Sequence, residues 1–212
     1  MTPRIRRNRT FVFLALLGFV PAALAFAGAP GLGKAREAST HKAKGARTNM
    51  EKTTTVEKAT FAAGCFWGVE AAFRQIKGVV STQVGYTGGR TANPSYEDVC
   101  TDRTGHAEAV EVTYDPARVS YDDLLSVFWT NHDPTTPNRQ GPDVGEQYRS
   151  AIFFHSPAQE SAAKASVSRL QAEHRFKRPI TTQILAAGPF YRAEDYHQQY
   201  LEKRGLSVCH IK

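Results

Sequence analysis

Three cysteines are the residues of this 212-residue chain best able to carry covalent chemistry, and Cys65 has the most informative position. It follows a β-rich stretch and precedes apolar residues at helical spacing, so it is predicted to open a helix. There the unpaired backbone N–H groups and the helix dipole favour thiolate over thiol. Gly64 and Gly68 leave room for a second molecule to approach. Placement alone leaves open the alternative of a small buried thiol without chemistry.

The other two cysteines, Cys100 and Cys209, differ in setting. Cys209 lies in a terminal segment after Gly205, and such a segment can bring a sulfur to a distant partner. Cys100 is predicted to be a buried structural thiol. Three cysteines cannot build a disulfide framework, and the lack of a Cys-x-x-Cys pair argues against a zinc ribbon and a thioredoxin-type motif. The histidines are scattered without ligand spacing, so no metal site is predicted.

The strands and helices that position these residues are predicted from the spacing of apolar residues and from the glycines and prolines that interrupt it. Strands are predicted at 56–63, 79–86, 107–114, 150–155 and 180–185, and helices at 65–77, 121–131, 157–175 and 193–203. A loop rich in proline and glycine occupies 132–148, and loops of this length tend to be functional. The order β-α-β-β-α-β-α-β-α predicts a single α+β domain, a mixed β-sheet flanked by helices.

The N-terminal quarter of the chain has the pattern of a targeting signal followed by a flexible linker. Four arginines precede an uncharged, mostly apolar run at 11–27, which ends in two Ala-x-Ala frames. We therefore predict a signal peptide or N-terminal anchor at 1–27, a flexible basic linker at 28–56 and a folded domain at 57–212. The protein is expected to be exported, to the periplasm if the source is a bacterium. An uncleaved anchor stays open, because the apolar run is at the short edge of a membrane span.

The net charge of +7 does not indicate a nucleic-acid partner. Residues 1–57 hold 10 of the 27 Lys and Arg and 3 of the 20 Asp and Glu, which leaves 17 of each for 58–212. A nucleic-acid-binding domain would carry its basic patch on the folded part.

Several ordered motifs resemble one family. They are GCFWG at 64–68, GYTGG at 85–89, SYEDVC at 95–100, TGHAE at 104–108, FW to DPT at 128–135, DVGEQYRS at 143–150 and AEDYHQQY at 193–200. Together they are similar to peptide methionine sulfoxide reductase A (MsrA), over roughly 57–212. The resemblance implies a ferredoxin-like core and an enzyme that reduces the S epimer of methionine sulfoxide, free or in oxidised proteins under repair.

The resemblance also implies residue roles for this reduction. Cys65 would be the nucleophile and Glu108 the proton donor, with its pKa raised by burial. Tyr96 and Tyr148 would hydrogen-bond the sulfoxide oxygen. Cys209 would then resolve the Cys65 sulfenic acid as a Cys65–Cys209 disulfide.

The pocket and the partners are implied in the same way. Phe66 and Trp67 would wall a pocket for the S-methyl group, and Asp143 would hold water or orient the tyrosines. No prosthetic cofactor is expected, and the electrons would come from thioredoxin or an exported thioredoxin-like protein. A monomer is expected. For His197 a role near the site and a role in packing or capping both stay open.

Two other classes compete with the reductase. One is a cysteine hydrolase with a Cys-His pair, although no histidine lies in a motif that would place it beside Cys65. The other is a non-enzymatic oxidant sensor in which Cys65 and Cys209 form a disulfide switch. Turnover of a sulfoxide with dithiothreitol separates the reductase from both.

Overall fold

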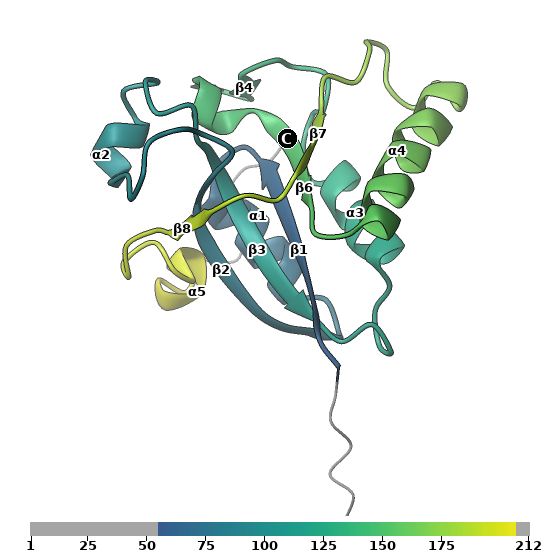
Figure 1. The fold of residues 1–212 in the computed structure, drawn as a ribbon, viewed down its shortest axis with the longest axis horizontal. Coiled ribbons are helices and arrows are strands. Elements are labelled where there is room, and N and C mark those ends of the chain that lie inside the picture. The colour runs from purple at the N-terminus through teal and green to yellow at the C-terminus, as the bar shows by residue number, and fades with distance from the viewer. Residues whose placement is uncertain (1–54, 207–212) are drawn as a thin grey trace, which may run out of the picture. The chain divides into compact units, whose positions relative to one another are not determined.

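The computed structural model describes residues 55–206 (Figure 1). The predicted signal peptide, most of the linker and Cys209 lie outside the described residues. In chain order the elements are β1 (Glu57–Ala63), α1 (Phe66–Arg74), β2 (Val79–Thr87), α2 (Tyr96–Val99), β3 (Ala107–Tyr114), α3 (Tyr121–Thr130), β4 (Arg139–Gln140), β5 (Asp143–Val144), the 3₁₀ helix η1 (Glu146–Tyr148), β6 (Ser150–Phe154), α4 (Pro157–Ala172), β7 (Gln183–Ala186), β8 (Phe190–Arg192) and α5 (Tyr200–Lys203).

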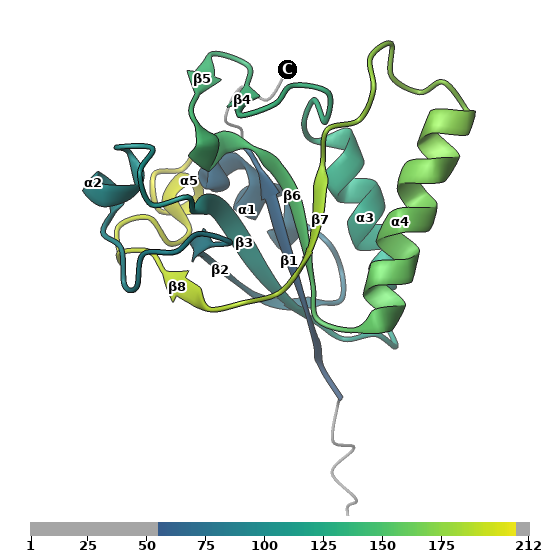
Figure 2. The same ribbon diagram turned by 45° about the horizontal axis from the view of Figure 1, so that its top comes forward.

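One six-stranded sheet organises the domain, in the order β7-β6-β1-β3-β2-β8. All pairs of adjacent strands in this sheet are antiparallel except the pair of β6 and β7, which is parallel. The inner four strands, β6-β1-β3-β2, are connected through α1 and α3, which is the βαββαβ arrangement of a ferredoxin-like fold. The predicted α+β class and mixed sheet are therefore confirmed. Figures 1 and 2 place α3 and α4 at the β7 end of the sheet and α2 and α5 at the β8 end.

The core lies between the sheet and its helices, and β3 shows how the sequence dictates this. Val110, Val112 and Tyr114 alternate along β3 onto the face that packs against Phe61 and the helices. Ala107 and Ala109 point to the opposite face and belong to a smaller cluster there. Because side chains alternate along a strand, position 108 lies on the same face as position 110. Glu108, the second residue of β3, therefore points towards the helical layer.

Local signals set the starts of two helices as expected. Ser120 caps α3, and its hydroxyl accepts from the backbone N–H of Asp123 while the Asp123 carboxylate accepts from the N–H of Ser120. Such a capping box satisfies donors that the first helical turn leaves unpaired. Pro157 is the first residue of α4 after the cap Ser156, where a missing N–H costs nothing.

The predicted helix at 193–203 is wrong over most of its length. Only Tyr200–Lys203 is helical, and Gln199 before it has a left-handed backbone with φ 53°. The side chain of Gln198 bonds both the N–H and the carbonyl of Val84 on β2. These bonds to the sheet hold residues 193–199 out of a helix, with turns at 195–199, against their helical propensity. The predicted strand at 180–185 is real but begins only at Gln183.

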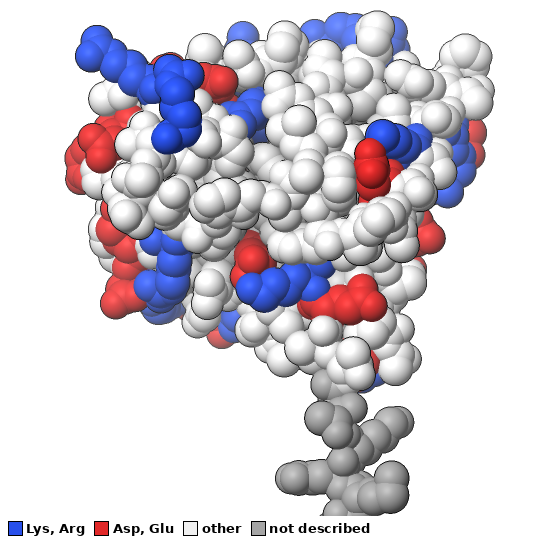
Figure 3. Space-filling model, viewed as in Figure 1, with Lys and Arg blue, Asp and Glu red and all other residues white. Residues whose placement is uncertain are grey.

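The described surface carries both signs of charge. On the face shown in Figure 3 the basic and acidic side chains are interspersed. Over residues 55–206, no helix has the length and apolar character needed to cross a membrane.

Candidate active site

Cys65 is the N-cap residue of α1, at the turn that leaves β1. Its side chain is half-buried. Gly64 before it has φ +90°, a backbone that L side chains rarely adopt. This turn places Cys65 at the end of α1 where the backbone N–H groups have no intrahelical partner and the dipole is positive, as the sequence predicted.

Glu108 lies directly beside that turn. Its carboxylate Oε2 accepts from the backbone N–H of Phe66, at 3.1 Å, and the residue is 2% exposed. Burial raises the pKa of Glu108 to about 8; the Phe66 N–H lowers it in part and the nearby charge of Asp143 raises it further. A carboxyl with this pKa is mostly protonated at neutral pH. The site therefore holds an acid next to a cysteine at a helix start.

Two tyrosines complete the polar side of the site. Tyr148 lies in η1, and burial is the main cause that raises the pKa of its phenol, with contributions from the charges of Glu108, Asp143 and Cys65. Tyr96 opens α2, and burial likewise raises its pKa, with Glu108 among the contributing charges. Both phenols therefore stay protonated and able to donate around the Cys65–Glu108 pair.

An aromatic wall forms the apolar side. Phe66 is buried and packs against the rings of Tyr86 and His197, at centroid distances of 6.0 and 5.1 Å. Trp67 stacks on Tyr200 with centroids 3.7 Å apart, and its indole N–H donates to His197 Nδ1 at 3.0 Å. The stacking on Tyr200 fixes the face of the indole, and the hydrogen bond to His197 fixes its rotation in the ring plane. Such a wall suits a methyl group better than a charged one.

Sequence reasoning missed the residues that hold this wall and the tyrosines. His197, left open above, is 1% exposed and contacts Phe66, Trp67 and Tyr96. Glu194 accepts from the Tyr86 hydroxyl at 3.0 Å and from the backbone N–H of Tyr96 at 2.9 Å. The AEDYHQQY stretch was the available signal, but a helix prediction gave no reason to place these side chains behind the site.

Cys100 is not the buried structural thiol that was predicted. It is exposed, at the C-terminal end of α2. Burial raises the pKa of the Cys100 thiol, and the neighbouring Tyr96 hydroxyl lowers it in part. Helix α2 is a single turn and contributes only Val99 to the core, and the C-cap Cys100 that follows it faces outward.

The long loop at 132–148 reaches the site, as its length suggested. It holds the β4–β5 hairpin and η1, and so delivers both Asp143 and Tyr148. The side chain of Gln140 packs against Gly64, where an added Cβ would lie 2.5 Å from Gln140 Cγ. The loop is thereby fitted to the turn that carries Cys65.

The structure therefore brings together seven of the eight candidate residues: Cys65, Phe66, Trp67, Tyr96, Glu108, Asp143 and Tyr148. The eighth, Cys209, lies outside the described residues. Within residues 55–206, no cluster of His, Cys, Asp or Glu could hold a metal ion. A half-buried thiol at a helix start, a buried acid, two donating tyrosines and an aromatic wall on a ferredoxin-like sheet define a thiol-dependent oxidoreductase.

Comparisons with known proteins identify the family. A family profile described as peptide methionine sulfoxide reductase matches residues 57–212. Peptide methionine sulfoxide reductase MsrA of Geobacter metallireducens is 61% identical over 160 residues, which cover 76% of this chain and 99% of that protein. MsrA of Methanothermobacter thermautotrophicus is 65% identical over 155 residues, 73% of this chain and 92% of the relative. The chain belongs to the peptide methionine sulfoxide reductase A family.

Solved structures agree with this assignment. Reduced Mxr1 from Saccharomyces cerevisiae aligns with a TM-score of 0.69 and 36% identity, covering 74% of this chain and 90% of that one. Methionine sulfoxide reductase A of Corynebacterium diphtheriae aligns with a TM-score of 0.65 and 43% identity, covering 73% and 78%. The protein is a peptide-methionine (S)-S-oxide reductase, an oxidoreductase of protein repair that works by thiol chemistry.

Proposed function

We propose that Cys65 is the nucleophile and Glu108 the proton donor of this reductase. The observation that carries the proposal is the buried Glu108 carboxyl, hydrogen-bonded to the first N–H of the helix that Cys65 caps. The Cys65 thiolate attacks the sulfoxide, whose sulfur gains an electron pair and leaves as methionine. The oxygen, with the proton from Glu108, ends as the hydroxyl of a Cys65 sulfenic acid.

The remaining site residues bind and orient the substrate in this proposal. Tyr96 and Tyr148 donate hydrogen bonds to the sulfoxide oxygen, which polarises the S–O bond before attack. Phe66 and Trp67 enclose the S-methyl group. Asp143 holds water or orients the tyrosines, and its charge raises the pKa values of Glu108 and Tyr148.

Recycling requires a second thiol and an electron donor. We assign the second thiol to Cys209: it attacks the sulfenic sulfur, forms the Cys65–Cys209 disulfide and releases water. The family uses thioredoxin as reductant, without a prosthetic cofactor. For this chain we propose an exported thioredoxin-like domain as the electron donor. The predicted signal at 1–27 would carry the enzyme out of the cytosol, and outside the cytosol no glutathione pool reduces the disulfide. We further propose that it acts as a monomer.

Single turnover separates the two thiol roles. With each epimer of a methionine sulfoxide peptide, the parent should convert only the S epimer. Cys65→Ser should form no methionine, whereas Cys209→Ser should form about one equivalent and then stop when thioredoxin is the reductant. Methionine formation by Cys65→Ser would refute the nucleophile, and full thioredoxin-driven turnover by Cys209→Ser would refute the resolving thiol.

A further inference from the structure

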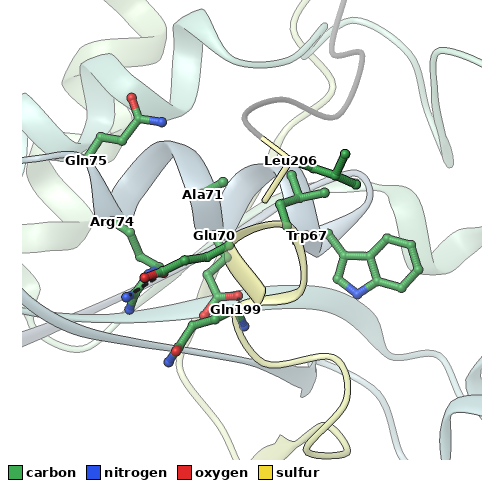
Figure 4. Close-up of a pocket in the computed structure, with 9 residues that line it drawn as sticks. Trp67, Glu70, Ala71, Arg74, Gln75, Gln199 and Leu206 are labelled. Atoms are coloured by element: carbon green, nitrogen blue, oxygen red, sulfur yellow. Dashed lines mark hydrogen bonds and ion pairs between the residues drawn. The ribbon is translucent and has the colours of Figure 1, made fainter. Parts of the chain in front are cut away.

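A groove of about 320 Å³ runs between α1 and the segment that ends the described chain (Figure 4). Its volume is at the lower end for ligand pockets, which run from about 300 to 1,000 Å³. One side is a single face of α1, and the other side is the chain around α5. The lining residues are Trp67, Glu70, Ala71 and Arg74 on α1 and its C-cap Gln75, with Gln199, Leu201, Glu202 and Leu206 opposite. The groove begins at Trp67, only two residues beyond Cys65.

Two contacts fix the two sides of this groove to one another. The buried Glu70 carboxylate accepts from the backbone N–H of Gln199 at 2.7 Å. Arg74 and Glu202 form an ion pair at 2.8 Å, and Leu201 is buried. Glu70 also accepts from the Thr82 hydroxyl on β2, at 2.9 Å. The groove is therefore a fixed part of the fold. The residues that join its two sides have no part in the proposed chemistry.

The chain turns back at the end of α5 towards the groove. Gly205 has a left-handed backbone with φ +66°, and the N–H of Leu206 donates to the carbonyl of Leu201 at 2.9 Å. This is a common way to end a helix, and it makes Leu206 a lining residue. Leu206 is still 53% exposed, so it leaves apolar surface at the rim uncovered.

The six residues that follow, Ser207 to Lys212, start at this rim. Extended, they span about 20 Å. In an extended segment alternate side chains share a face, so Val208 would share the face of Leu206 and Cys209 the opposite face. The tether gives them an effective concentration of the order of millimolar, which a separate ligand seldom reaches.

We propose that the groove binds the chain's own segment 207–212 through Val208, and so presents Cys209 to Cys65. This inference rests on the proposed role of Cys209 and adds a docking site to it. Val208 fills the space beside Ala71 and Trp67, next to the start of α1. The groove thereby sets the rate at which the sulfenic acid is resolved and leaves the rate of methionine formation unaffected.

The test compares Val208→Asp with the matched control Ile211→Asp, which places the same charge on the opposite face of the segment. In the full chain, quenched-flow measurements follow methionine formation and loss of the sulfenic acid separately, the latter by dimedone trapping. Val208→Asp should slow disulfide formation by about tenfold, the effect of keeping one valine side chain out of an apolar site. Ile211→Asp should stay within about twofold. Equal rates for the two variants, whether both slow or both unchanged, would overturn the proposal.

A groove variant and a crosslink test the same contact from the other side. Ala71→Leu fills the groove and should slow resolution as Val208→Asp does, with methionine formation kept as evidence of a folded site. A benzophenone amino acid at position 208 should crosslink to residues 67–75 or 199–206 of the same chain. Crosslinks to a second copy, to another region or to nothing would contradict the docking site. A parent that forms methionine but no Cys65–Cys209 disulfide would instead refute the proposed role of Cys209.

Discussion

The pKa of Glu108 links a buried carboxyl to a measurable rate. Its value of about 8 means that the proton is present at neutral pH and is lost as the pH rises through that value. The rate of methionine formation should therefore level off below about pH 8 and fall above it. Rapid-mix measurement of the first turnover from pH 6 to pH 10 would show the inflection.

Glu108→Gln should lose both the rate and the inflection. Glutamine keeps the size and can still accept from the Phe66 N–H, but it has no acidic proton to give. A general acid contributes about 10²–10⁴-fold, so the first turnover should slow by that order. Matched replacement of the exposed Glu97, on α2 near the site, should leave the rate unchanged. A Glu108→Gln rate within about threefold of the parent would count against the proton-donor role.

At the scale of elements, the turn between β1 and α1 joins the cysteine to the long loop. Gly64→Ala would place a Cβ on a backbone with φ +90° and against the Gln140 side chain. A non-glycine residue in such a conformation costs about 1–3 kcal/mol, and the clash also displaces the hairpin that carries Asp143. We expect lower stability in urea unfolding together with a slower first turnover.

The control for this turn is Gly188→Ala. Gly188 has no atom within 4 Å of an added Cβ and no positive φ. The free energy of unfolding of Gly188→Ala should stay within about 0.5 kcal/mol of that of the parent protein. If Gly64→Ala is as stable and as fast as Gly188→Ala, the turn does not need its glycine.

The sequence predicts the elements that have strong local signals, and fails where tertiary contacts decide. Alternation along 107–114 and the caps at Ser120 and Ser156 specify β3, α3 and α4 nearly to the residue. The motifs likewise indicate the residues around Cys65. Residues 193–199 have helical propensity, yet Gln198 pairs with the backbone of β2 instead. The supporting role of His197 and the exposure of Cys100 depend on those distant contacts, so no local pattern reveals them.

At the scale of the whole molecule, the location of the enzyme decides its electron donor. The arginines, the apolar run and the Ala-x-Ala frames at 1–27 motivate the proposal of export. A fusion of residues 1–57 to a reporter should be exported, and the N-terminus of the native protein should begin near Phe26 or Gly28. The same fusion with the four leader arginines replaced by glutamate is the control and should stay inside. Soluble cytosolic protein with an intact Met1 would refute export and leave the reductase chemistry untouched.

The supports of the methyl pocket have a consequence for biosynthesis. Trp67 is held by His197 and Tyr200, which are translated long after Cys65. During synthesis on the ribosome the chain therefore carries the nucleophile before it carries the finished pocket. The thiol stays without a completed site until residues 197–200 have emerged. A chain that stops before His197 still contains all six strands of the sheet, and it should fold to a domain without substrate specificity.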